Sequence, residues 1–225
     1  MAKGERTLFF LKPDATIRPY VGARILKQIL DSPFNPLAFQ RVALSKQFLT
    51  DFHYSIHKGK FFFDWLVDYI SVYPVVAVIL QGDDVIEQLR RILGPTFPEN
   101  AATEAPNSMR ARYGIFGGVN GCHASDSLET AAREIVNWQA NGFLREDSNA
   151  KKRTEEYVSQ HLDSPYVDSL RYRELSQSLV KDSSAKSSVR GSFVGLLKRE
   201  AAEDADRSTL EKLADSMVVN CMLGR

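Results

Sequence analysis

The sequence contains few cysteines and almost no imbalance of charge. Its 225 residues include two cysteines, Cys122 and Cys221, which lie far apart and lack the spacing of metal ligands. That count argues against a small secreted fold stapled by disulfides and is typical of a reducing compartment. With 29 basic and 28 acidic side chains the net charge is +1, which gives no sign of a nucleic-acid or membrane-surface protein. Any anion that the protein binds must therefore be held by a local cluster of cations.

Long hydrophobic runs are also missing. No stretch is long enough to span a membrane, and residues 1–6 show neither the apolar core of a signal peptide nor an arginine-rich transit pattern. Hydrophobic residues nevertheless make up 44% of the chain and charged residues 25%, which is ordinary for a globular protein. We therefore expect a cytoplasmic protein with one good-sized domain, alone or with a smaller appendage.

The spacing of apolar residues predicts an α+β fold. Short apolar or β-branched runs predict four strands, at residues 7–11, 39–44, 74–80 and about 120–123. Helical spacing predicts helices at residues 21–30, 46–53, 60–70 and 84–93, with a further helix after the last strand. Residues 74–80 are almost wholly apolar, so this strand is expected at the centre of the sheet. The order is the ferredoxin-like βαββαβ pattern with additional helices, and we expect an antiparallel sheet with helices covering one face.

Two more detailed predictions concern the helix after the last strand and residues 94–108. Asp126 is expected to cap the last helix, with Glu129 at the capping-box position. The buried stripe of that helix would consist of Leu128, Ala131, Ala132, Ile135 and Val136. Residues 94–108 are rich in small residues and interrupted by proline, so they predict a long loop, which in a compact domain is usually functional or disordered.

The composition changes after residue 142. Residues 145–165 are strongly charged, and residues 176–192 are rich in serine and lysine. Ser208 and Glu211 have the spacing of a capping box, and a helix is also predicted at residues 189–197. The apolar stripe that follows the capping box consists of Leu210, Leu213, Ala214, Met217, Val218 and Cys221. We predict a domain of residues 1–143 and a helical C-terminal extension of residues 144–225, of unknown role.

A histidine lies where the last predicted strand gives way to the capped helix. His123 stands within residues 120–127, Asn-Gly-Cys-His-Ala-Ser-Asp-Ser. Histidine titrates near neutrality, and its free ring nitrogen is a nucleophile toward phosphorus. The start of a helix also offers N–H donors to phosphate oxygens. A single histidine in this position is more often structural, so the residues alone leave both interpretations open.

The same string resembles the active-site signature of nucleoside diphosphate kinases, N-x-x-H-G/A-S-D-S. Other motifs in the same order extend the resemblance over about residues 5–143: Glu5-Arg6-Thr7, Leu11-Lys12-Pro13-Asp14, Phe61-Phe62, Pro74-Val75-Val76-Ala77, Leu93-Gly94-Pro95-Thr96 and Ser108-Met109-Arg110. The sequence departs from the usual pattern at Pro19-Tyr20 after Arg18 and in a longer loop at residues 32–36. These departures bear on oligomeric assembly more than on chemistry, because every catalytic position is filled.

The resemblance implies a role for each matched residue. His123 would accept the phosphate, Glu134 would hold its imidazole in one tautomer, and Ser125 would bond that carboxylate. Lys12 would serve both catalysis and nucleotide binding. The other matched nucleotide-binding positions are Tyr54, Phe62, Arg90, Thr96, Arg110 and Asn120.

Without the resemblance, several of these residues would have simpler interpretations. Arg90 and Arg110 would be taken as ordinary surface arginines. Tyr54 and Phe62 would pass for core aromatic residues, and Glu134 lies off the apolar stripe and would pass for a solvated residue. The assignment of these side chains to a nucleotide site therefore depends on the resemblance.

The implied reaction is a ping-pong transfer of the terminal phosphate of a nucleoside triphosphate to a nucleoside diphosphate through phospho-His123. Mg²⁺ would be the cofactor, held mainly by the nucleotide phosphates and water, with no protein ligand set evident. The implied partners are nucleoside di- and triphosphates and further copies of this chain as a homo-oligomer, with no nucleic acid and no membrane. A protein partner of the extension is left open.

A different class of function is the main alternative. The same fold could serve as a scaffold or regulatory module, for example in a ciliary assembly, with catalysis secondary. Retention of His123, Lys12, Arg110, Asn120 and Glu134 favours the enzyme, since a scaffold does not need the whole set. Nucleic-acid binding is disfavoured by the lack of a basic stripe. Every matched site residue precedes residue 141, so we expect a site complete without the extension, whose apolar stripe must dock on this domain, a neighbouring subunit or another protein.

Overall fold

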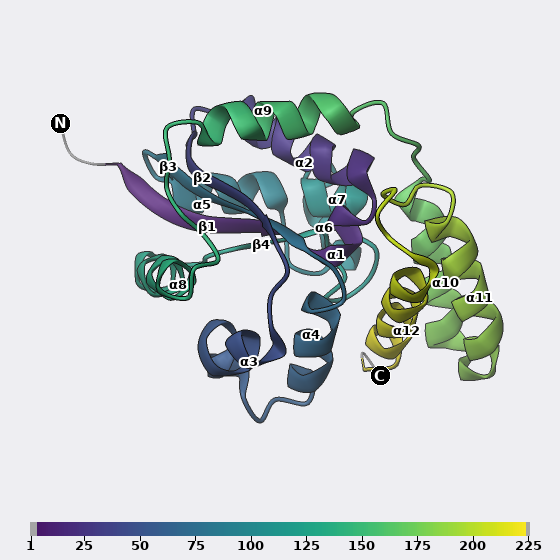
Figure 1. Cartoon of the computed structure of the whole chain (residues 1–225). Coiled ribbons are helices and arrows are strands. Elements are labelled where there is room, and N and C mark those ends of the chain that lie inside the picture. The colour runs from purple at the N-terminus through teal and green to yellow at the C-terminus, as the bar shows by residue number, and fades with distance from the viewer. Residues whose placement is uncertain (1–3, 224–225) are drawn as a thin grey trace.

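A four-stranded antiparallel sheet lies at the centre of the computed structural model, which describes residues 4–223 (Figure 1). Its strands are β1 (Glu5–Leu11), β2 (Asn35–Val42), β3 (Val75–Gly82) and β4 (Cys122–Ala124), in the order β2-β3-β1-β4. β3 pairs with β2 and β1, and its first six residues are buried, as its apolar sequence predicts. The predicted ferredoxin-like sheet is confirmed.

Helices cover both faces of this sheet, so the expectation of a single covered face was wrong. α2 (Pro19–Leu30) and α5 (Val85–Leu93) pack with one set of strand side chains, which includes Phe9 and Val78. α4 (Phe63–Ile70) and α8 (Leu128–Ala140) pack with the alternate set, which includes Phe10 and Ile79. The reason is visible in the sequence, because β1 and β3 are apolar at successive positions and successive side chains point to opposite faces.

Other boundaries differ from the predictions for local reasons. β2 begins at Asn35 and not at residue 39, since an edge strand tolerates Pro36, which adjoins a register shift. The segment predicted as a long loop contains α6 (Pro98–Glu104), where Pro98 occupies the first turn of the helix. The remaining short elements are α1 (Pro13–Thr16), α3 (Lys46–Phe48), the π-helical turn Leu49–His53, the 3₁₀ turns Ser55–His57 and Ser183–Ala185, and α7 (Met109–Tyr113).

The predicted helix caps and the predicted buried face of α8 differ from those in the structure. The hydroxyl of Ser127, not the side chain of Asp126, accepts the hydrogen bond from the Thr130 N–H at the start of the helix. Leu128 and Val136, predicted as buried, are 60% and 62% exposed. The face that α8 turns to the sheet carries Ala131, Glu134, Ile135 and Trp138. In the extension, the carboxylate of Asp206, not Ser208, accepts from the Thr209 N–H at the start of the last helix.

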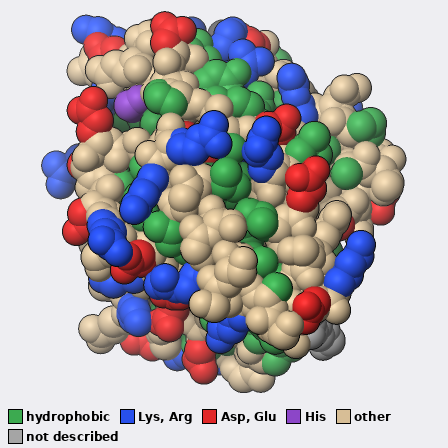
Figure 2. Space-filling view, turned by 90° about the vertical axis from the view of Figure 1, so that its right-hand side faces the viewer, with side chains coloured by type: hydrophobic (Ala, Val, Ile, Leu, Met, Phe, Trp, Pro, Cys, Tyr) green, Lys and Arg blue, Asp and Glu red, His purple; other side chains and the backbone are tan. Residues whose placement is uncertain are grey.

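The extension is helical and packs on the rest of the chain. α9 (Ala150–His161) lies across α2 and β2, while α10 (Ser169–Lys181), α11 (Lys186–Leu197) and α12 (Arg207–Leu223) pack together beside α4 (Figure 1). The face that carries these helices has basic and acidic side chains mixed over it (Figure 2). Within residues 4–223, no helix is long and apolar enough to cross a membrane.

A buried ion pair joins the extension to the start of the chain. Nε of Arg18 lies 2.8 Å from Oε1 of Glu200, and both side chains are 0% exposed. The same guanidinium donates to the carbonyl of Val167 and the hydroxyl of Ser169, and Tyr172 donates to the Glu200 carboxylate. The predicted apolar stripe of α12 is buried in the hydrophobic cluster shared with the sheet. The extension thus finds its docking surface within its own chain.

Candidate active site

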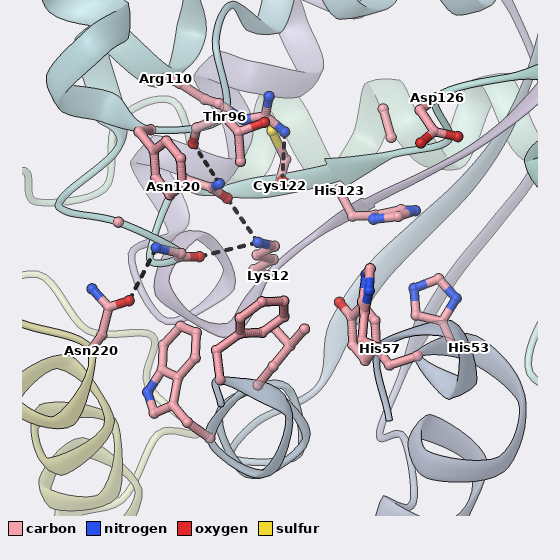
Figure 3. A pocket seen from close by; sticks show the side chains of 18 of the residues that line it. Lys12, His53, His57, Thr96, Arg110, Asn120, Cys122, His123, Asp126 and Asn220 are labelled. Atoms are coloured by element: carbon pink, nitrogen blue, oxygen red, sulfur yellow. Dashed lines mark hydrogen bonds between the residues drawn. The ribbon is translucent and has the colours of Figure 1, made fainter. Parts of the chain in front are cut away.

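A cavity of about 770 Å³ opens beside β4, with walls from α4, α8 and α12. Its size falls within the range typical of small-molecule sites. All of the predicted site residues except Ser125 line it: Lys12, Tyr54, Phe62, Arg90, Thr96, Arg110, Asn120, His123 and Glu134. Segments far apart in the sequence therefore meet at one hollow (Figure 3).

His123 is held in a fixed orientation at the cavity wall. On β4 it pairs with Phe10 of β1, and the two rings stack with centroids 4.8 Å apart. Nε2 of His123 lies 3.0 Å from Oε2 of Glu134, and the Ser125 hydroxyl donates to the same oxygen over 2.7 Å. A neutral ring whose Nε2–H donates to a carboxylate carries its lone pair on Nδ1. The arrangement can present Nδ1 as a nucleophile.

Glu134 is ionised although it is buried. Only 4% of the residue is exposed, and burial disfavours the carboxylate. The nearby His123 ring and the hydrogen bonds from His123 and Ser125 outweigh burial and lower the pKa of Glu134 to about 2. The side chain therefore provides a fixed negative charge next to the imidazole.

His53 lies against the hydrogen-bonded cluster of His123, Glu134 and Ser125, and no sequence pattern indicated this. Its ring centroid is 4.8 Å from that of His123, and its Nδ1 accepts from the indole of Trp138 and lies 3.8 Å from Oε1 of Glu134. Burial, and then the proximity of His123, lowers the pKa of His53 to about 3, so its ring is neutral near pH 7. His53, His123 and Glu134 have the chemistry of metal ligands. His53 Nδ1 is engaged by Trp138, while its Nε2 is buried without a hydrogen-bond partner among the described residues.

Lys12 supplies a buried cation on the opposite side of the hollow. Its Nζ donates to the Asn120 side-chain oxygen over 2.8 Å and to the Gly118 carbonyl over 3.1 Å. The Asn120 amide in turn donates to the carbonyl of Thr96 over 2.8 Å. Burial, and then the positive charge of Arg110, lowers the pKa of Lys12 to about 8.

Arg110 is positioned by backbone carbonyls. It lies in α7, whose first turn is capped by the Ser108 hydroxyl. Its terminal nitrogens donate to the carbonyls of Gly94 and Cys122 over 2.9 and 3.2 Å. Nε of Arg110 is buried and has no hydrogen-bond partner among the described residues. No carboxylate is among these hydrogen-bond partners, so its charge is available to an anion in the cavity.

The remaining predicted residues form the rim. Arg90 is exposed on α5, and Thr96 is exposed in the loop that follows. Tyr54 is 5% exposed, so most of the residue is packed in the core. Phe62 is partly buried at the start of α4, and its ring meets that of Phe61, which is 76% exposed, edge to face.

Asp14 stabilises the loop that precedes His123. Its carboxylate accepts from the Gly121 N–H over 3.0 Å and from the Tyr69 hydroxyl. Gly121 has a φ of 85°, a left-handed conformation that favours glycine. Asp14 stands in the Lys12-Pro13-Asp14 motif, but nothing in that motif indicates a role for it.

The extension also reaches the cavity, which the sequence pattern did not indicate. Asn220 and Leu223 of α12 belong to its lining, together with Trp65 of α4 and Phe97. Figure 3 shows Asn220 pointing toward the loop beside Lys12. Nothing in the sequence pattern of α12 distinguishes Asn220 from an ordinary polar position of a helix.

Comparison with known proteins agrees with this geometry. Residues 5–142 match the family model described as nucleoside diphosphate kinase. The nucleoside diphosphate kinase of Aquifex aeolicus is 41% identical over 131 residues, 58% of this chain and 91% of that protein. The nucleoside diphosphate kinase of Pyrococcus furiosus is 38% identical over 165 residues, 67% and 99% of the two chains.

Solved structures show the same relationship. A crystal structure of the Aquifex aeolicus nucleoside diphosphate kinase matches with a TM-score of 0.57 and 40% identity, covering 59% of this chain and 93% of that one. The family match ends at residue 142, before α9 begins, so α9–α12 all lie beyond it. Since the match covers more than half of the chain and nearly the whole of these relatives, the chain belongs to the nucleoside diphosphate kinase family of phosphotransferases.

Proposed function

We propose that this nucleoside diphosphate kinase works by a ping-pong mechanism in which His123 carries the phosphate between two nucleotides. The observation that carries the proposal is the pair of hydrogen bonds that Ser125 and His123 donate to the Glu134 carboxylate at the cavity wall. A buried carboxylate is costly to keep. Here it orients one imidazole toward a cavity of suitable size, which a scaffold would not require.

In the first half-reaction, the lone pair of His123 Nδ1 attacks the γ-phosphorus of the nucleoside triphosphate. The Nδ1–P bond forms while the bond from phosphorus to the bridging oxygen breaks, and the diphosphate leaves with that electron pair. The ring becomes positively charged, and its Nε2–H remains bonded to Glu134, whose charge offsets it. In the second half-reaction, a terminal oxygen of another nucleoside diphosphate attacks the same phosphorus and Nδ1 recovers its lone pair.

The cations and aromatic side chains would bind the nucleotide. Lys12 and Arg110 would neutralise charge on the transferring phosphate, and Arg90 would act from the rim. Tyr54, Thr96 and Asn120 would contact the phosphates and sugar. Phe62 would stack on the base, and stacking tolerates every base because each has a π face.

Mg²⁺ fits this site only as an ion carried by the substrate. Of the carboxylates that line the cavity, Glu99 accepts from the Gly117 N–H and Glu134 accepts from His123 and Ser125. Asp126 is exposed at the cavity and would hold a hydrated ion through water. When bound, the ion neutralises phosphate charge, while the protein's own cations complete the neutralisation.

The test is a labelling experiment with the full chain. Incubation with ATP labelled at the γ-phosphate should give an acid-labile, base-stable phosphoprotein, and His123→Ala should abolish the label. His161→Ala, in α9, is the matched control and should retain it. Label that persists in His123→Ala would contradict the mechanism, and a chain that never becomes labelled would favour the scaffold alternative.

Three further proposals accompany the mechanism. The end of the family match at residue 142 supports a catalytic domain of residues 1–143 followed by an extension of residues 144–225. We also propose a homo-oligomer, which light scattering would measure. The two free, buried cysteines are compatible with the predicted cytoplasmic location, which fractionation would test.

A further inference from the structure

The segment of residues 110–120 supplies three groups to the phosphate site. Arg110 lies at its start, the Gly118 carbonyl accepts from Lys12, and Asn120 accepts from Lys12 at its end. Apart from α7 it contains no regular helix or strand. Within it, Ile115 and Phe116 donate to the Val119 carbonyl and Val119 donates to the Phe116 carbonyl. The other buried backbone groups need partners from elsewhere, as Gly117 N–H finds in Glu99.

The extension provides many of those partners. Arg173 of α10 donates from Nε to the Gly114 carbonyl over 2.8 Å and from a terminal nitrogen to the carbonyls of Arg110 and Ala111, over 3.2 and 2.6 Å. The Ser169 hydroxyl donates to the carbonyl of Tyr113, which precedes Gly114, over 3.1 Å. The end of α7 is thus capped by α10.

Asn220 of α12 holds the part nearest to Lys12. Its amide nitrogen donates to the Phe116 carbonyl over 2.8 Å, and its amide oxygen accepts from the Gly118 N–H over 3.0 Å. Only 7% of Asn220 is exposed. Gly117, between these two residues, has a φ of 53°, and a Cβ there would lie 2.9 Å from the Asn220 amide. The loop and the amide therefore fit closely, and only glycine allows this approach.

These bonds form a continuous series across the site. Asn220 bonds the N–H of Gly118, the Gly118 carbonyl accepts from Lys12, and Lys12 donates to the Asn120 side chain (Figure 3). A displacement of the loop at Gly118 removes one of the two bonds that fix the Lys12 ammonium. The position of Lys12 thus depends on a helix that begins almost 200 residues later in the chain.

We propose that Asn220 is a positioning residue of the phosphate site, which keeps the Phe116–Gly118 loop and thereby Lys12 in place. The inference rests on the proposed role of Lys12 in neutralising the transferring phosphate. Asn220 acts through Lys12, so its loss reduces turnover more than nucleotide affinity, since a misplaced cation weakens its contact with the transition state most.

The experiment uses the full chain and measures kcat and KM for phosphate transfer from ATP to a nucleoside diphosphate. Asn220→Ala removes both hydrogen bonds, and Asn220→Asp keeps the shape but places a carboxylate oxygen against the Phe116 carbonyl. Each should lower kcat by about tenfold, the effect of roughly 1.4 kcal/mol of lost positioning, with less change in KM. Asp204→Ala is the control, since Asp204 joins the extension to Arg41 and Tyr73 away from the cavity and its loss should leave kcat unchanged.

A double-mutant cycle with Lys12→Ala decides whether Asn220 works through Lys12. If it does, Asn220→Ala should cause little further loss of kcat when Lys12 is already absent. Losses that multiply in full, or a wild-type kcat in both Asn220 variants, would overturn the inference. If Asn220→Ala does not fold, the same double-mutant cycle is measured with the isosteric Asn220→Asp variant in its place. A fully active Lys12→Ala variant would instead refute the proposed role of Lys12, whatever Asn220 does.

Discussion

The buried ammonium of Lys12 predicts a fall in activity at alkaline pH. Burial and the neighbouring charge of Arg110 lower its pKa from the ordinary value of 10.5 to about 8, although Asp14 and Cys122 act in the opposite direction. The charged form is therefore present below about pH 8 and is lost as the pH rises through that value. If the reaction needs this cation, kcat/KM should fall by about tenfold for each pH unit above the pKa, because only the charged fraction reacts.

The assay measures kcat/KM for phosphate exchange between about pH 6.5 and 10. At each pH a control confirms that the coupling enzymes are stable and do not limit the rate. kcat/KM is the correct quantity because it reports the pKa of the free enzyme. In the complex the substrate phosphates would stabilise the charged lysine, so the fall in kcat should begin at higher pH. Burial raises the pKa of the Cys122 thiol, so deprotonation of that neighbour does not explain a fall that begins near pH 8.

Lys12→Arg provides the decisive comparison, since a guanidinium stays charged throughout this range. Its absolute activity should be lower because the larger group does not fit the bonds to Gly118 and Asn120, but its alkaline fall should disappear. A wild-type profile that stays flat to pH 10 would refute the reasoning. So would the same alkaline fall in Lys12→Arg, which would assign it to another group.

Three more predictions follow from the same structure. Arg110→Ala should lower kcat by on the order of 10²-fold, as for loss of one preorganised donor, and a change in KM alone would make Arg110 a simple binding group. Purine and pyrimidine diphosphates should react with kcat/KM values within about a hundredfold of each other; a larger preference would imply a polar group that reads the base edge. Glu200→Ala should leave the Arg18 charge buried without its partner, at a cost of roughly 3–5 kcal/mol. Thermal unfolding should then show a melting temperature lower by roughly 6–20 °C, and an unchanged melting temperature would show that water or another group replaces Glu200.

Local sequence patterns predicted the strands and the position of His123 well. The apolar runs of β1 and β3 allow few other structures, and the string around His123 combines a strand end with a helix start within eight residues. The same patterns failed for α8, where Leu128 and Val136 are exposed and Glu134 is buried. Periodicity gives the spacing of a stripe, but the rotation of the helix on the sheet depends on tertiary partners such as Ser125 and His123.

The contribution of Asn220 could not have been predicted from local pattern. Its function depends on two backbone groups more than 100 residues away in the sequence. No feature of α12 itself indicates that the helix will lie against a glycine-containing loop. The buried ion pair of Arg18 could not have been predicted from local pattern either, since Glu200 lies 182 residues away in the sequence. Long-range polar contacts of this kind are visible only once the chain has folded.

Arg18 and Glu200 are 182 residues apart in the sequence, and this separation has a consequence for synthesis on the ribosome. Translation at about 5–20 residues per second places roughly 10–40 s between the two residues. Once Glu134 has been made, the nascent chain contains every matched catalytic residue but still lacks the partner of Arg18 and the helix that carries Asn220. In that state the Arg18 guanidinium is without Glu200, and the loop that contacts Lys12 is without its two hydrogen bonds to Asn220. By the effect expected for Asn220→Ala, a chain in this state would transfer phosphate about tenfold more slowly than one in which α12 has docked.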